Sequence, residues 1–179
     1  MWRLNEAGEP AGPVFNGNTV LECATEVLQV DLDPPAAPVG RVCVRFVTPT
    51  ELKSEHRVAE RPEFGILFGR LRDRISTLRS LYSDGPLDID FRAMGERAAA
   101  VRIVRCELRR TAVDRLSSHS GQRHSLGGFV GEVQYEDKLG EFMPYLHLAK
   151  WVGVGRQTVW GKGLLTASVM SFPNTMGTF

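Results

Sequence analysis

Residues 39–82 have the sequence VGRVCVRFVTPTELKSEHRVAERPEFGILFGRLRDRISTLRSLY, in which a strand pattern is followed by a helix pattern. In its first ten residues, 39–48, apolar side chains alternate with arginine and cysteine. The apolar positions are Val42, Val44 and Phe46. A period of two is typical of a half-buried β-strand. We expect the strand to end at Pro49, because proline cannot donate a hydrogen bond to a neighbouring strand.

A helix is expected after Pro62 and Glu63, since proline and acidic residues favour the first turn of a helix. Apolar side chains recur there at helical spacing, which predicts one buried face. These side chains are Phe64, Leu67, Phe68, Leu71, Ile75, Leu78 and Tyr82. Gly85 and Pro86 end the helix. We interpret its basic residues as a solvated face. They are Arg70, Arg72, Arg74 and Arg79.

The rest of the chain continues to alternate between strand and helix patterns. A short helix, two strands joined by a polar tip, a further helix and a last strand follow in that order. Pro144 falls in the later helix, and we place it in or near the first turn. The expected ranges are 90–100 for the short helix, 104–116 for the second strand, 117–125 for the tip, 129–136 for the third strand, 139–149 for the later helix and 159–169 for the fourth strand.

The element order from residue 39 onward is β-α-β-β-α-β. This order predicts the α+β class and a ferredoxin-like sandwich, a four-stranded antiparallel sheet with helices on one face. We assign the domain to residues 39–171. Residues 1–38 form an N-terminal extension with one expected strand between 19 and 33, and residues 172–179 form a tail.

Composition limits the class of protein. The chain has 179 residues, of which 42% are hydrophobic and 24% charged, and this balance is that of an ordinary globular protein. No apolar run is long enough to span a bilayer, and the N-terminus lacks the pattern of a secretory signal. The three scattered cysteines, Cys23, Cys43 and Cys106, are expected to be reduced core thiols. We therefore expect a cytoplasmic protein without a membrane contact, a metal or a cofactor.

Residues 153–163, GVGRQTVWGKG, contain four glycines between the later helix and the last strand. Glycine permits positive φ and close approach of a ligand to the backbone. Exposed N–H groups beside Arg156 and Lys162 would suit a phosphate chain. A tight helix-to-strand crossover beneath the sheet explains the spacing equally well. The segment matches neither the P-loop nor the dinucleotide-binding fingerprint, because no Gly-Lys-Ser/Thr follows and a strand comes next.

Three segments together resemble the C-terminal part of the CRISPR-associated endoribonucleases that process precursor guide RNA, in the repeat-associated mysterious protein superfamily. They are Leu126–Tyr135 (LGGFVGEVQY), Phe142–Leu146 (FMPYL) and residues 153–163. The family hallmark is Gly-hydrophobic-Gly, five residues that include Lys or Arg, and a second Gly-hydrophobic-Gly. Arg156 supplies the basic residue. Lys162 stands where the family usually has a hydrophobic residue.

The resemblance implies that the glycine segment and the hairpin tip hold RNA. The residues expected to contact RNA are Gly153, Gly155, Arg156, Gly161, Lys162, Gly163, Arg115 and Arg123. His119 and His124 are candidates for a general acid or base. The alternative for the tip is a solvated hairpin end, where polar and basic residues are common.

The resemblance also implies a reaction and its partners. Family members cut CRISPR repeat RNA without a metal, by attack of a 2′-hydroxyl on the adjacent phosphate, and carry their catalytic histidine in an N-terminal ferredoxin-like domain. This chain has room for one such domain, so we expect it to bind repeat RNA and not to cut it alone. Its expected protein partners are an N-terminal ferredoxin-like domain or other CRISPR-associated subunits. Two alternatives stay open: a non-catalytic RNA-binding or scaffolding subunit of a CRISPR effector complex, and a ferredoxin-like protein-association domain.

Overall fold

The computed structural model describes residues 2–4, 10–21, 31–55, 57–83, 85–111, 114–116, 123–125 and 127–170. The chain divides into two compact units, residues 1–31 and 32–179. In the first unit, β1 (Trp2–Leu4) pairs antiparallel with β2 (Pro10–Pro13), and Phe15 forms a bridge with Val20. Most of the strand expected between 19 and 33 lies outside the described residues, as does the tail 172–179.

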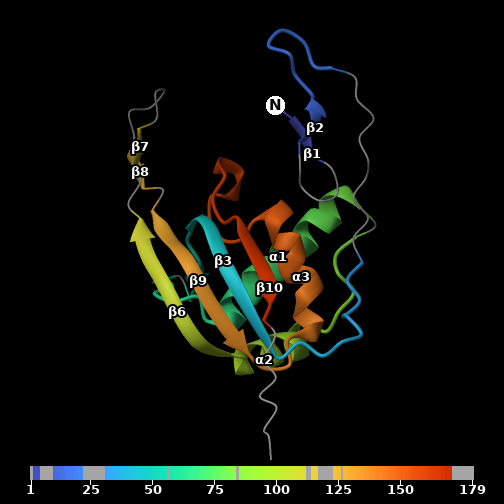
Figure 1. Ribbon diagram of the computed structural model, residues 1–179, viewed down its shortest axis with the longest axis vertical. Coiled ribbons are helices and arrows are strands. Elements are labelled where there is room, and N and C mark those ends of the chain that lie inside the picture. The colour runs from blue at the N-terminus through green and yellow to red at the C-terminus, as the bar shows by residue number, and fades with distance from the viewer. Residues whose placement is uncertain are drawn as a thin grey trace, which may run out of the picture. The chain divides into compact units, whose positions relative to one another are not determined.

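The second unit contains a four-stranded antiparallel sheet with the strand order β10-β3-β9-β6 (Figure 1). Its strands are β3 (Arg41–Thr50), β6 (Arg102–Thr111), β9 (Gly128–Glu136) and β10 (Leu165–Val169). Its helices are α1 (Phe64–Tyr82), α2 (Phe91–Ala100) and α3 (Met143–Val152). The prediction of an α+β domain with four antiparallel strands is confirmed.

Short elements connect these strands and helices. Two of them are two-stranded hairpins, β4 (Lys53–Ser54) with β5 (Arg57–Val58) and β7 (Asp114–Leu116) with β8 (Arg123–Ser125). Two are 3-10 turns, η1 (Gly140–Phe142) and η2 (Thr158–Trp160). Pro144 lies in the first turn of α3, as the sequence predicts.

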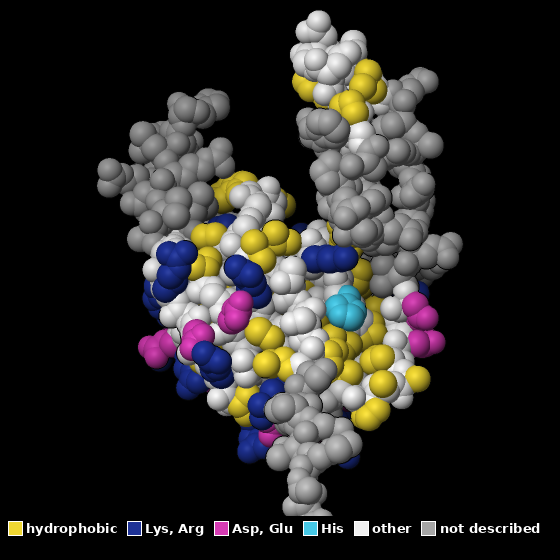
Figure 2. All heavy atoms as spheres, viewed as in Figure 1, with side chains coloured by type: hydrophobic (Ala, Val, Ile, Leu, Met, Phe, Trp, Pro, Cys, Tyr) yellow, Lys and Arg dark blue, Asp and Glu magenta, His cyan; other side chains and the backbone are white. Residues whose placement is uncertain are grey.

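The core lies between the helices and one face of the sheet. Alternate residues of β3 are buried, as the period of two predicts; they are Val42, Val44 and Phe46. The apolar stripe of α1 is buried at Phe64, Leu67, Phe68, Leu71 and Ile75, whereas Tyr82, which the spacing placed on the same face, is 82% exposed. The opposite face of the sheet is exposed, and basic and acidic side chains are interspersed over the surface seen in Figure 2.

An aromatic cluster joins α1, β9 and the start of α3. The ring of Phe64 contacts the rings of Tyr135 and Phe142 at centroid distances of 5.0 and 5.1 Å, in edge-to-face geometry. Phe68 also contacts Phe142, at 4.7 Å. The Tyr135 hydroxyl donates a buried hydrogen bond of 2.6 Å to the carbonyl oxygen of Pro62. Burial raises the pKa of Tyr135 well above its usual value, so the hydroxyl stays protonated and keeps this donor.

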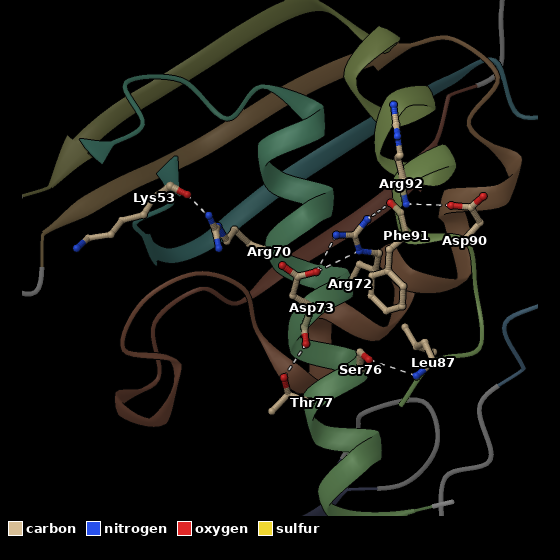
Figure 3. A network of polar contacts seen from close by, with 10 residues as sticks. All are labelled: Lys53, Arg70, Arg72, Asp73, Ser76, Thr77, Leu87, Asp90, Phe91 and Arg92. Carbon is tan, nitrogen blue, oxygen red and sulfur yellow. Dashed lines mark hydrogen bonds and ion pairs between the residues drawn. The ribbon is translucent and has the colours of Figure 1, made fainter. Parts of the chain in front are cut away.

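Polar contacts fix α1 against α2 (Figure 3). The guanidinium of Arg72 donates to the carbonyl oxygen of Phe91 at 2.6 Å, lies 4.6 Å from the Phe91 ring centroid and pairs with Asp73. Asp90 caps α2 by accepting from the backbone N–H groups of its second and third residues. The interpretation of Arg72 as a solvated residue is wrong, because its side chain is only 13% exposed.

The structure corrects three strand assignments. Pro49 does not end β3, which runs to Thr50; the pairing register shifts between Phe46 and Thr50, and such an irregularity tolerates proline. Val159 lies in η2 and is 83% exposed, so the last strand begins only at Leu165. In β6 a register shift after Ile103 interrupts the alternation that the sequence predicted.

The expected burial of the cysteines is confirmed only in part. Cys43 is half-buried in β3, and burial together with the neighbouring Glu132 raises the pKa of its thiol. Cys106 is exposed on β6, so it is not a core residue. Cys23 lies outside the described residues. Among the helices of the described segments, none has the length and apolar character needed to cross a bilayer.

Candidate functional site

The glycine loop, residues 153–163, connects α3 to β10. All four of its glycines have positive φ: Gly153 at 67°, Gly155 at 85°, Gly161 at 79° and Gly163 at 77°. Gln157 is also left-handed, at 62°. Only glycine adopts these angles freely, which is the physical reason for the unusual composition of this segment.

The loop packs closely against the end of β3. The N–H of Arg156 donates to Glu51 O at 3.0 Å, and the N–H of Gly163 donates to Pro49 O at 3.2 Å. A Cβ on Gly155 would lie 2.4 Å from Glu51 O, and one on Gly163 would lie 2.0 Å from Val154 O. The close approach at these two glycines is therefore between parts of this chain, as in a tight crossover.

Most N–H groups of the loop already have partners in the protein. Six of them donate to backbone oxygens: those of Gly153, Val154, Arg156, Trp160, Gly161 and Gly163. A phosphate would therefore have at most five of the eleven backbone N–H groups of the loop as donors in this conformation. The side chains that the loop presents are the other source of contacts.

Arg156 is the loop's exposed basic side chain. Its Nη1 donates to Glu51 Oε1 at 2.5 Å, and its side chain is 47% exposed while that of Glu51 is 15% exposed. The half-buried carboxylate holds one edge of the guanidinium. Arg156 also lines a depression of about 760 Å³ that we call the α1 groove.

The α1 groove lies between α1, the β4–β5 turn and the glycine loop. Its residues are Lys53, Glu55, Arg70, Asp73, Arg74, Thr77, Leu78, Leu81, Gly155 and Arg156. Two arginines that the sequence placed on a solvated helix face, Arg70 and Arg74, thus lie in the same depression as Arg156. Their spacing of four residues was the available signal, since residues i and i+4 share a helix face.

Lys162 has a different environment from Arg156. It is 5% exposed, and its Nζ donates to Gly127 O at 2.7 Å and to Gln157 Oε1 at 2.9 Å. Burial lowers the pKa of its ammonium group; Glu51 opposes this effect and the charge of Arg156 adds to it. Gly127 directly precedes β9, so Lys162 ties the glycine loop to the base of the β7–β8 hairpin.

The hairpin residues are described only by their backbone. Arg115 pairs with His124, and Leu116 pairs with Arg123, across β7 and β8. The side chains of these residues lie outside the described part of the chain, and so does His119 entirely. Within the described residues, His, Cys, Asp and Glu form no group of three or more that could hold a metal ion.

The fold and the loop together define an α+β domain with a four-stranded sheet and a basic groove beside a glycine-rich crossover. Small modules with a four-stranded sheet are common among RNA-binding proteins. The family model of the CRISPR-associated endoribonuclease Cas6 matches residues 44–165, which is more than half of the chain. The chain belongs to this family.

Solved Cas6 structures share the fold. Thermus thermophilus Cas6 aligns with a TM-score of 0.58 and 24% identity, over 76% of this chain and 56% of that one. A Cas6 product complex aligns with a TM-score of 0.53 and 20% identity, over 73% of this chain and 52% of that one. The chain thus spans about half the length of these Cas6 chains.

A partial Cas6-RT-Cas1–Cas2 complex aligns with a TM-score of 0.52 and 16% identity, over 75% of this chain and 23% of that one. No sequence among the curated proteins matches this chain.

The loop geometry predicts different costs for two alanine substitutions. Gly155→Ala should lower the free energy of unfolding by more than about 2 kcal/mol, because it combines positive φ with a backbone clash. Gly161→Ala should cost only about 1 kcal/mol, because φ is positive but the space is open. Urea unfolding of both variants measures the difference. Equal losses would contradict the packing of Gly155 on Glu51.

A second prediction concerns proton linkage at Lys162. Because burial lowers its pKa in the folded protein, the unfolded chain binds more protons between that value and 10.5. The free energy of unfolding of the wild type should therefore rise with pH in this interval relative to Lys162→Met, which lacks the titrating group. Urea unfolding of both proteins, at neutral pH and at pH values approaching 10.5, measures this difference. If the difference in free energy of unfolding between wild type and Lys162→Met does not change with pH, the ammonium group is not buried.

Proposed function

We propose that this chain is the C-terminal, RNA-binding domain of a Cas6-type endoribonuclease that processes precursor guide RNA. The observation that carries the proposal is Arg156, an exposed guanidinium on the glycine loop of a Cas6-family chain, held at one edge by Glu51. The strand order β10-β3-β9-β6 supports a ferredoxin-like topology, since it places the fourth, first, third and second strands side by side.

In this proposal the glycine loop holds the RNA backbone. Arginine has a planar fork of donors that matches a phosphate, and Glu51 limits the orientations that Arg156 can adopt. The glycines keep the loop surface free of side chains next to that guanidinium. Lys162 contributes by fixing the loop; a direct phosphate contact would require its ammonium group to leave Gly127 and Gln157.

The hairpin supplies the second part of the proposed RNA-binding surface. Arg115 and Arg123 lie on adjacent strands, β7 and β8, at the end of the β6–β9 pair. Lys162 connects the base of this hairpin to the glycine loop. Because this buried lysine joins the glycine loop to the hairpin, the distance between these two binding elements along the RNA would stay fixed.

Cleavage in this proposal requires a further domain. A 2′-hydroxyl attacks the adjacent phosphate, a general base removes its proton, a general acid protonates the leaving 5′-oxygen, and a 2′,3′-cyclic phosphate remains. Both groups must lie within hydrogen-bond reach of the reacting oxygens. This chain spans about half of the Cas6 chains it matches, and we assign it the binding half of the task in the cytoplasm, with repeat RNA and an N-terminal ferredoxin-like domain as partners.

The proposal predicts a salt-dependent loss of affinity for Arg156→Ala. Removing one phosphate contact to single-stranded RNA flattens the plot of log affinity against log salt by roughly 0.7. Binding of repeat RNA across a salt series measures this slope. Arg92→Ala is the matched control, because Arg92 is a 91% exposed arginine on α2 that also pairs with a glutamate. If Arg156→Ala keeps the affinity and slope of wild type while folded, the loop is only structural.

A separate prediction is that the isolated chain does not cut repeat RNA. End-labelled repeat RNA incubated with purified chain in EDTA should remain intact, because the general acid and base are expected in another domain. Product analysis would detect a 2′,3′-cyclic phosphate end. Site-specific cutting that His119→Ala or His124→Ala abolishes would place the active site on the hairpin instead.

A further inference from the structure

We propose that the α1 groove is a second phosphate-binding site, which takes the backbone of the single-stranded RNA segment next to the one held by Arg156. The inference rests on the proposed RNA-binding function and extends it to residues outside the glycine loop. Its phosphate ligands are Arg70, Arg74 and Lys53.

The charges in the groove favour a polyanion. Four basic side chains converge there from three parts of the chain: Lys53 from β4, Arg70 and Arg74 from α1, and Arg156 from the glycine loop. The acidic side chains that line the groove are Glu55 and Asp73, and Glu51 pairs with Arg156 beside it. The groove therefore keeps a net positive charge next to the glycine loop.

The two arginines of α1 are held in position by the protein. Arg70 Nε donates to Lys53 O at 2.9 Å, and Arg74 Nε donates to Val152 O at 2.5 Å. Each of these hydrogen bonds uses Nε and so restricts the orientation of the guanidinium. The two terminal nitrogens of each guanidinium can then donate to a phosphate. Figure 3 shows Arg70 reaching toward Lys53, while Arg72 points toward α2. Fixed guanidinium groups lose little entropy when they bind a phosphate.

The groove also offers apolar surface beside its charged side chains. The groove has a volume of about 760 Å³ and is continuous with Gly155 at one side. Leu78 and Leu81 line it as well, and Leu81 is 67% exposed. The guanidinium groups offer charge for the phosphate of a nucleotide, and the half-buried Leu78 and exposed Leu81 offer apolar surface for its ribose or base.

A second depression of the described surface is less suited to RNA. It lies on the open face of the sheet, and its charged residues are Arg45, Arg109, Glu107 and Glu132. The positive and negative charges there are equal in number, and Arg45 lies 3.8 Å from Glu132. A face with balanced charges gives no net attraction to a polyanion, so the α1 groove is the site that charge complementarity selects.

Salt-dependent binding of a short oligouridylate to the full chain tests the proposal. The double substitution Arg70→Gln with Arg74→Gln should flatten the slope of log affinity against log salt by about 1.4, twice the roughly 0.7 expected for one contact on a single strand. Arg79→Gln is the matched control, since Arg79 is an exposed arginine of α1 that does not line the groove. Glu55→Gln should tighten binding, because it removes a negative charge from the groove. Thermal melts establish that each variant is folded.

The outcomes separate this inference from the proposed function. If wild type binds oligouridylate and Arg156→Ala flattens the slope, while the double variant binds with the slope of wild type, the groove proposal is wrong and the proposed function stands. If wild type binds no RNA, both are wrong. If the double variant unfolds, Lys53→Gln and Glu55→Gln test the proposal instead, since both residues are exposed. The first variant should bind RNA more weakly than wild type and the second more tightly. Unchanged affinity for RNA in both variants overturns the proposal, and the groove then does not contact RNA.

Discussion

The aromatic cluster of Phe64, Tyr135 and Phe142 holds α1 against β9 and against the start of α3. Phe64 is the first residue of α1, and the ring of Tyr135 contacts its ring. The Tyr135 hydroxyl also donates a hydrogen bond to the carbonyl oxygen of Pro62, two residues before the helix begins. Phe142 contacts the same ring at the point where α3 begins, and α3 leads directly into the glycine loop. One buried cluster thus fixes both walls of the groove, so the basic residues on α1 and Arg156 keep a constant spacing.

The elements that the sequence predicted best are those whose pattern needs only local information. The apolar stripe of α1 and the alternation in β9 follow from spacing alone, because each element buries one face. The sequence ended β3 too early, at Pro49, because the register shift that accommodates this proline depends on pairing with β9, which is far away in the sequence. Val159 was assigned to the last strand with the apolar residues that follow it, yet it lies in a 3-10 turn between two left-handed residues, Gln157 and Gly161.

In the candidate site, too, local features were predicted from the sequence and contacts between distant residues were not. Four closely spaced glycines predicted unusual backbone angles, and this expectation is confirmed because it depends on each residue alone. The environment of Lys162 could not be predicted, since its partner Gly127 is 35 residues away. The carbonyl groups that hold Arg70 and Arg74 belong to Lys53 and Val152, and only the folded chain brings them beside α1. A periodic row of arginines on a helix does not by itself distinguish a solvated face from a groove.

Strand β6 lies at the edge of the sheet, with its outer backbone groups free of any strand in the described part of the chain (Figure 1). Such an edge is a template on which another chain can add a strand and start aggregation. Four of its ten residues are arginine: Arg102, Arg105, Arg109 and Arg110. Two copies that met edge to edge would bring these cations together at the spacing of paired strands, which is repulsive. The arginines therefore protect a long open edge against self-association.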